Sequence, residues 1–327
     1  MSPTQTPQPV LVAYDGSSTS HGTLRAALAV LQPAPLIILT VWTRVRSNEG
    51  PRQRTPADAR DRVAVALDAE AEDAAMTIAR QGAEVATASG WQAVPETAPA
   101  APSGRLGERS RWHTISSRAE AADVSVLVVG GAGRAGAMIM GRTTYALVHR
   151  SAVPVLVVPP GAAVGTGPLV AAYDGSDHAR FAVEAAAHAI RSTQAVVLSV
   201  WRSVRPAADA ARIALPDAVV REGLLELERT SEHDARRRAE QGAAHARDVG
   251  LNAEPLSVRA ERSVAGAIVG HARAREAPAI VVGTRGRSEL TSLLLGSVAW
   301  DVLARADRPV LVAPFRAAGQ ASRSATR

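Results

Sequence analysis

The sequence contains the same pattern twice. Residues 10–17 read VLVAYDGS, and residues 169–176 read LVAAYDGS. Three later blocks recur in the same order: Val41-Trp42 as Val200-Trp201, VLVVG at 126–130 as AIVVG at 279–283, and VPVLVVP at 153–159 as RPVLVAP at 308–314. A repeat this long exceeds any solenoid unit. It therefore predicts two homologous domains, 1–160 and 161–327, joined by the Pro- and Gly-rich linker 159–168.

Short Val-rich runs alternate with helical patterns within each copy. In the second copy we expect strands at 169–173, 195–201, 253–258, 279–283 and 310–314, and helices at about 179–192, 218–249, 264–275 and 296–306. Such alternation is typical of parallel strands covered by helices on both faces. The predicted fold is a doubly wound five-stranded α/β sheet, used twice.

The composition excludes several kinds of chemistry. The sequence has no Cys, which removes disulfides, thiolate metal sites and cysteine nucleophiles. All 37 basic residues are Arg, so a Walker-type phosphate loop and a Schiff-base lysine are excluded too. The eight His residues show no metal-ligand spacing, and we predict no metal site.

The charge pattern and hydropathy bear on partners and location. The net charge is +6, but the Arg residues are scattered among acids and only 3% of residues are aromatic, which argues against nucleic-acid binding. No apolar run is long enough to span a bilayer, and residues 1–9 do not resemble a signal peptide. We therefore expect a soluble cytoplasmic protein with no membrane partner.

One loop of the second copy suits a phosphate group. Residues 283–297 read G-x2-G-x9-G-S, leaving the fourth strand and entering the last helix. Gly283 and Gly286 allow backbone N–H groups to approach a ligand, and the helix starting at Gly296-Ser297 offers unpaired N–H groups and a positive dipole end. The Ser297 hydroxyl would either contact phosphate or cap the helix. Asp174, at the end of the first strand, falls where the strand order switches and ligands of such sheets bind. It would face the base or ribose, because the phosphates would repel its carboxylate.

With these motifs the sequence resembles the universal stress proteins, specifically their tandem two-domain members. The resemblance rests on the Asp-Gly-Ser after the first strand, on the G-x2-G-x9-G-S segment, and on the closing Pro-Val-Leu-Val strand. It implies an adenine nucleotide alpha hydrolase-like sheet with strand order 3-2-1-4-5, and pairing of the two domains through their last strands as an intramolecular pseudo-dimer. It also implies ATP as the ligand, with any Mg²⁺ carried by the nucleotide, and a role in a stress response.

Carried over residue by residue, the resemblance gives a nucleotide site in the second copy. The residues expected around the adenine, ribose and phosphates are Ala172, Tyr173, Asp174, Val200, Val282, Gly283, Arg285, Gly286, Gly296, Ser297 and Val298.

The first copy departs from this motif. Its loop from Gly130 to Gly141 has seven residues in the last gap instead of nine, and Arg142 replaces the Ser. The corresponding residues are Asp15, Val41, Gly130, Gly133, Gly141 and Arg142. The first copy also carries a Pro/Ala-rich insertion at 93–104, expected to be a flexible surface loop, and the tail from about 316 is expected to be disordered.

Other interpretations stay open. Each Asp of the Asp-Gly-Ser motifs could cap the following helix, and the glycines could be turn residues only. The Arg236–Arg238 run is interpreted as a solvated helix face. The chain could be an interaction module that binds no nucleotide, or a very slow ATPase, although no catalytic constellation is evident. The sequence leaves open a homodimer of tandem chains and an unidentified protein partner.

Overall fold

The fold was determined as a computed structural model, which describes residues 7–44, 57–103, 108–134, 137–203, 217–284 and 295–314. The predicted tail from about 316 lies outside these residues.

We call the chain up to strand β9 the N-terminal half and the chain from β10 onward the C-terminal half. The elements of the N-terminal half are β1 (Val10–Ala13), α1 (Ser18–Val30), β2 (Leu36–Trp42), α2 (Ala57–Ala88), β3 (Ala93–Pro99), β4 (Ala101–Ser103), β5 (Glu108–Ser110), α3 (Arg111–Ala121), β6 (Val126–Gly130), β7 (Ala132–Arg134), β8 (Ala137–Ile139), α4 (Arg142–Arg150) and β9 (Val155–Val158). Those of the C-terminal half are β10 (Leu169–Ala172), α5 (Asp177–Ala189), β11 (Gln194–Arg202), α7 (Asp217–Asp248), β12 (Asn252–Ala260), α8 (Val264–Ala274), β13 (Ile280–Gly283), α9 (Ser297–Arg305) and β14 (Val310–Ala313).

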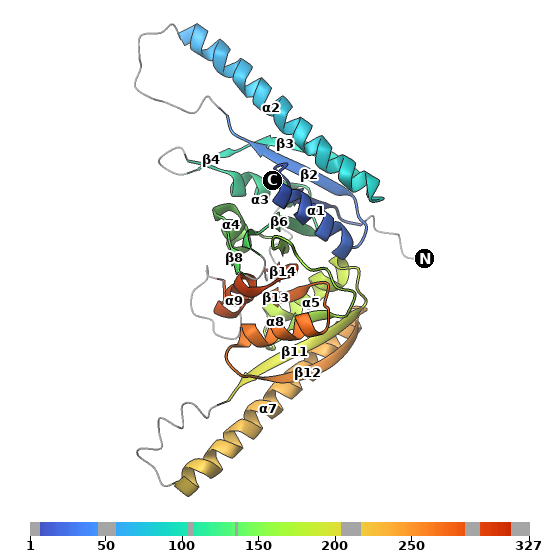
Figure 1. The fold of residues 1–327 in the computed structure, drawn as a ribbon, viewed down its shortest axis with the longest axis vertical. Coiled ribbons are helices and arrows are strands. Elements are labelled where there is room, and N and C mark those ends of the chain that lie inside the picture. The colour runs from blue at the N-terminus through green and yellow to red at the C-terminus, as the bar shows by residue number, and fades with distance from the viewer. Residues whose placement is uncertain are drawn as a thin grey trace, which may run out of the picture.

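The large strands form one continuous sheet of ten strands through the middle of the molecule (Figure 1). Its order is β12-β11-β10-β13-β14-β9-β6-β1-β2-β3, so each half has the order 3-2-1-4-5. Strands within a half are parallel, and the halves meet where β14 pairs with β9 in antiparallel register. The α/β fold class with tandem repeats, predicted from the sequence, is confirmed.

Helices cover both faces of this sheet. Alternate strand residues point to opposite faces, as the pleat requires, so that Val10 and Val12 pack on one side and Leu11 on the other. Helices α1, α2, α5 and α7 pack on the first face, and α3, α4, α8 and α9 on the second. Both cores run through the two halves, so that burial of apolar surface couples one half to the other.

The first copy was predicted wrongly at residues 93–104. Residues 93–99 form strand β3 instead of a surface loop, and they pair with β2 from Leu36↔Ala93 to Trp42↔Pro99. Strand β3 lies at the outer edge of the sheet, where the missing N–H groups of Pro95 and Pro99 cost no ladder hydrogen bond on the solvent side. Residues 101–103 continue into a small hairpin of β4 with β5.

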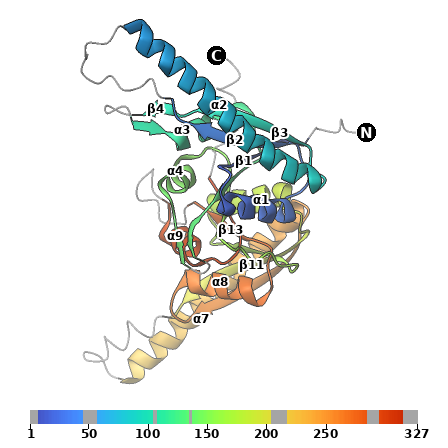
Figure 2. The ribbon, with the colours of Figure 1, turned by 45° about the horizontal axis from the view of Figure 1, so that its top comes forward.

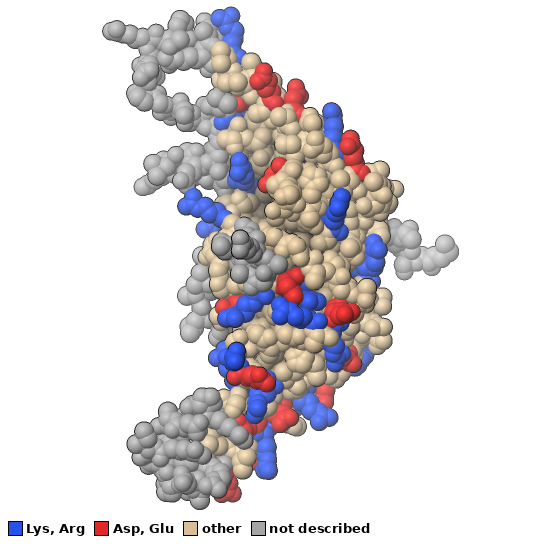
Figure 3. Space-filling view, in the orientation of Figure 1, with Lys and Arg blue, Asp and Glu red and all other residues tan. Residues whose placement is uncertain are grey.

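The charged side chains are distributed without a single-sign patch on the face shown in Figure 3, where arginine and acidic residues lie intermixed. Among the described residues, no helix is both long enough and apolar enough to cross a membrane.

Candidate functional site

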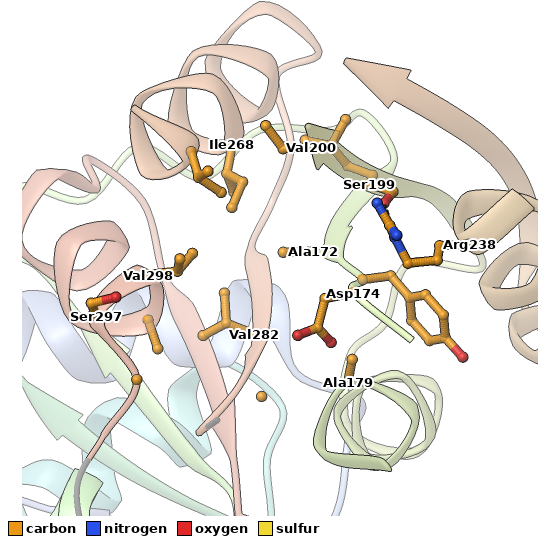
Figure 4. Close-up of a pocket in the computed structure, with 16 residues that line it drawn as sticks. Ala172, Asp174, Ala179, Ser199, Val200, Arg238, Ile268, Val282, Ser297 and Val298 are labelled. Carbon is orange, nitrogen blue, oxygen red and sulfur yellow. Dashed lines mark hydrogen bonds between the residues drawn. The ribbon is translucent and has the colours of Figure 1, made fainter. Parts of the chain in front are cut away.

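A cavity of about 310 Å³ lies at the carboxyl ends of the strands in the C-terminal half (Figure 4). It opens beside β10, the central strand of this half, whose neighbours are β11 on one side and β13 on the other. The chain reverses its strand order there, which is where open α/β sheets bind ligands. Nine residues predicted from the sequence line it: Ala172, Tyr173, Asp174, Val200, Val282, Gly283, Gly296, Ser297 and Val298. Two others, Arg285 and Gly286, lie outside the described residues.

Asp174 sits at one side of the cavity in a turn that it helps to hold. Its Oδ1 accepts hydrogen bonds from the Ser176 N–H at 3.0 Å and the Ser176 hydroxyl at 2.6 Å. The Ser176 Oγ in turn accepts from the Ala179 N–H at 3.2 Å, so Ser176, rather than Asp174, caps α5. Gly175 between them has a φ of +84°, which favours glycine. Figure 4 shows the Asp174 carboxylate directed toward the cavity.

The opposite side of the cavity is the beginning of α9. Gly296 is the N-cap residue, and its own N–H donates to the Thr284 carbonyl at 2.7 Å. Among the described residues no side chain caps this helix, and Ser297, which occupies the first helical position, is exposed. The N–H groups of the first turn therefore retain the capacity to bind an acceptor, at the positive end of the helix dipole.

Apolar side chains form the walls between these two sides. Val200 of β11, Ile268 of α8, Val282 of β13 and Val298 of α9 surround the cavity in Figure 4. A ligand that fits this arrangement has an apolar, flat middle portion, hydrogen-bond donors facing Asp174, and an anionic or acceptor group facing α9.

Gly283 has a packing role that the sequence reading did not anticipate. A Cβ at this position would lie 2.7 Å from the carbonyl carbon of His178 and 2.8 Å from its oxygen. The glycine therefore allows the end of β13 to approach the first turn of α5, whatever binds nearby.

The N-terminal half has an equivalent cavity of about 850 Å³. Asp15, Val41, Gly130 and Gly141, four of the residues named from the sequence, line it. Arg142, at the first position of α4, exposes its side chain to solvent and is not among the described residues that line this cavity. Gly133 lies in β7.

Hydrogen bonds favour the ionised form of Asp15, the acid of the N-terminal cavity. Burial raises the pKa of Asp15, but hydrogen bonds from Ser17 and Ser20 outweigh burial and leave this pKa below its usual range. The Asp15 Oδ1 accepts from the Ser17 N–H at 3.0 Å, as Asp174 does from Ser176.

The comparison with protein families fits this duplicated architecture. A model described as the universal stress protein family matches residues 7–159 and again residues 166–314. The chain belongs to the universal stress protein family. Its tandem arrangement follows from the two matches.

Solved structures show the same fold over the whole chain. A universal stress protein from Archaeoglobus fulgidus is 17% identical, with a TM-score of 0.58 over 95% of this chain and 99% of that one. A functionally unknown protein from Pseudomonas aeruginosa is 17% identical, with a TM-score of 0.54 over 94% of this chain and 92% of that one. No curated protein sequence matches the chain.

Sequence reasoning missed two polar residues of this tandem universal stress protein's C-terminal cavity. Arg238 of α7 and Ser199 of β11 both line it, and the Arg238 Nε lies 3.4 Å from the Ser199 Oγ. The interpretation of Arg236–Arg238 as a solvated helix face does not hold for Arg238, which is partly buried. Helical spacing could have corrected this, because Arg238 follows the buried Ala235 by three residues and precedes Gly242 by four.

The two cavities of this universal stress protein have their arginine side chains at different positions. Ile78 of α2 occupies the position of Arg238 in the N-terminal cavity. Arg111, the first residue of α3, lines that cavity, whereas Val264 begins α8 in the C-terminal half.

Within the described ranges, no group of three or more His, Asp or Glu residues could hold a metal ion.

Proposed function

We propose that the chain is an ATP-binding regulatory protein of the stress response, with the nucleotide held mainly in the C-terminal half. The observation that carries the proposal is the arrangement of one cavity: a helix N-terminus that no described side chain caps on one side, Asp174 on the other, and apolar walls between. Family membership supports it, since the chain matches the universal stress protein model twice.

The chemistry of the cavity suggests how ATP would lie. The triphosphate would face the first turn of α9, where Ser297, Val298 and Ala299 offer backbone N–H groups. The base would contact the valines and Ile268, and Asp174 would accept hydrogen bonds from ribose hydroxyls or an exocyclic amine. Any Mg²⁺ would arrive with the nucleotide. Arg238 would add a donor at the end far from α9, where Figure 4 shows it.

We infer that the bound nucleotide acts as a signal rather than a rapidly consumed substrate. Among the described residues that line the cavity, Asp174 is the one carboxylate, and its Oδ1 already accepts two hydrogen bonds from Ser176. No His lines the cavity in the part of the chain that the structure describes. A water at the phosphate end would thus lack a positioned base, so we expect hydrolysis to be slow or absent.

The test is equilibrium binding of labelled ATP to the full chain carrying Ser297→Asp. A carboxylate at the first helical position complements the helix dipole, so the melting temperature should stay the same or rise. The same charge would repel the triphosphate, and we expect ATP affinity to fall at least about tenfold, since two like charges at about 4 Å repel by several times RT near a protein surface. Ser297→Ala is the matched control and should bind nearly as wild type.

A second arm uses Asp174→Asn, which keeps an acceptor for Ser176 but removes the charge and an acceptor facing the cavity. Weaker ATP binding in Ser297→Asp and Asp174→Asn, with normal melting, supports the proposal. Unchanged affinity in both variants would rule out this cavity as the ATP site. A wild-type chain that shows neither ATP binding nor a thermal shift at millimolar ATP would instead favour an interaction module.

A further inference from the structure

The phosphate-facing end of the C-terminal cavity is held by a residue of the other half. Helix α4 of the N-terminal half and helix α9 of the C-terminal half both lie at the junction of the halves (Figures 1 and 2). The Leu295 N–H, one residue before the Gly296 cap of α9, donates a hydrogen bond of 3.3 Å to Nδ1 of His149 on α4. These two residues are separated by 146 positions in the chain.

A second contact holds the same helical turn from its other end. The Trp300 N–H donates to the Gly296 carbonyl at 3.0 Å, which closes the first turn of α9. The Trp300 ring meets Tyr145 of α4 edge-on, with ring centroids 5.7 Å apart. Tyr145 in turn lies against the His149 ring at 4.1 Å between centroids. Two residues of α4 thus contact both ends of the turn that lines the cavity.

The duplicated sequence shows that the two halves share the aromatic contact but differ at the position of His149. Superposing the helices by sequence aligns Tyr145 with Trp300, so the aromatic contact is made by equivalent residues. The same alignment sets His149 against Ala304, whose side chain has no hydrogen-bond acceptor. The Ala304 side chain therefore cannot give the N-terminal half the hydrogen-bond acceptor that His149 gives the C-terminal half.

We propose that His149 is a positioning residue for the C-terminal site: it fixes the start of α9, so that the N-terminal half completes the nucleotide site of the other half. This inference rests on the proposed function for its ligand. Because coupling between a ligand and a contact is reciprocal, ATP bound at α9 would also strengthen the contact between the halves.

The experiment measures ATP affinity and amide hydrogen exchange in the full chain, for wild type, His149→Ala and His149→Asn. Asn places an amide oxygen close to the position of Nδ1 and keeps an acceptor for the Leu295 N–H. We expect His149→Ala to weaken ATP binding about fivefold, the effect of losing one neutral hydrogen bond, and His149→Asn to recover most of it. His188→Ala, which removes an exposed ring from α5, is the control and should bind as wild type.

Hydrogen exchange supplies a readout that needs no nucleotide. In the ligand-free chain, amides at 295–299 should exchange faster in His149→Ala and return toward wild type in His149→Asn, with β9 and β14 unchanged. Unchanged ATP affinity in His149→Ala, or a loss that Asn does not recover while exchange rises throughout the chain, would overturn the proposal. If wild type binds no ATP, the proposed function fails, and exchange at 295–299 alone decides whether His149 holds this turn.

Discussion

Gly283 ends β13 beside the backbone of His178 in α5. A methyl group there would meet the backbone of His178, which belongs to a helical turn and cannot rotate away as a side chain could. Gly270, in the middle of α8, is the opposite case, because a Cβ there would meet nothing within 4 Å. The two glycines thus differ in what a methyl group would meet.

We expect Gly283→Ala to lower the free energy of unfolding by about 1–3 kcal/mol through overpacking. Gly270→Ala should raise it by about 0.5–1 kcal/mol, because alanine is the better helix former. Urea denaturation of the two variants measures both changes. Equal stabilities of Gly283→Ala and wild type would show that β13 and α5 can separate without cost.

Arg308 is the buried cation of the junction region. It is 3% exposed, and its guanidinium donates to the Asp307 Oδ1 at 2.9 Å and to the Ala277 carbonyl at 2.8 Å. Arg273 Nε also donates to the Asp307 Oδ2 at 2.9 Å. Burial raises the pKa of Asp307, but the hydrogen bonds and charges of Arg308 and Arg273 outweigh burial, so this pKa is below its ordinary value.

Asp307→Asn should therefore destabilise the chain by about 2 kcal/mol at pH 7, because it leaves a buried charge without its counter-ion. A depressed folded-state pKa gives stability that is complete above the unfolded pKa near 4 and is lost as pH falls through the folded value. The difference between wild type and variant should thus be constant from pH 7 to about 5 and shrink toward pH 3.

Denaturation at pH 7, 5, 4 and 3 checks this, with Asp234→Asn on the exposed face of α7 as the control. A difference of the same size at pH 3 and pH 7 would mean that the Asp307 charge contributes nothing.

At the scale of elements, the two longest helices show how the repeat is built. Helices α2 and α7 each have 32 residues, and each packs through an alanine stripe: Ala75, Ala79, Ala83 and Ala86 in one, Ala235, Ala239, Ala243 and Ala246 in the other. Small side chains at this spacing let a helix lie close to the sheet. The first parts of both helices extend beyond the sheet at opposite ends of the molecule (Figure 1).

The sequence predicted the elements of the second copy well because their patterns are local. Strand β3 was missed because its residues, AVPETAP, neither alternate nor avoid proline, and its pairing with β2 comes from distant contacts. The repeat could have predicted this strand, because Pro95 aligns with Pro255 of β12, the other edge strand. Arg238 was missed for a related reason, since its place beside the cavity depends on how α7 packs against β11.

At the scale of the whole molecule, the halves are joined by more than one strand pair. Besides β9 and β14, Leu31 after α1 and Ile190 after α5 form a bridge between the halves, and both are 1% exposed. The Gln32 N–H donates to the Ala189 carbonyl, and the Arg191 N–H to the Val30 carbonyl, at 2.8 and 2.9 Å. Equivalent residues meet at this bridge, as in an isologous dimer interface.

We predict that the two halves unfold in a single transition and that this bridge couples them. Leu31→Ala and Ile190→Ala should each cost about 2–5 kcal/mol, and the double variant should cost less than their sum by at least 0.5 kcal/mol, because the two side chains share one contact. Chemical denaturation of the four proteins of this cycle measures the coupling. Two separate transitions, or strictly additive losses, would show that the halves fold independently.

The one-sided bond from His149 to Leu295 has a consequence for how such a chain can evolve. In a dimer of identical subunits every substitution appears twice. A histidine that supports the site of one subunit is therefore also present at the equivalent position beside the site of the other. Covalent fusion removes that constraint, since equivalent positions of one chain can differ, as His149 and Ala304 do. Two copies fused in one chain can therefore differ, so that one half holds a helix of the other half's site. A dimer of identical subunits cannot have this asymmetry.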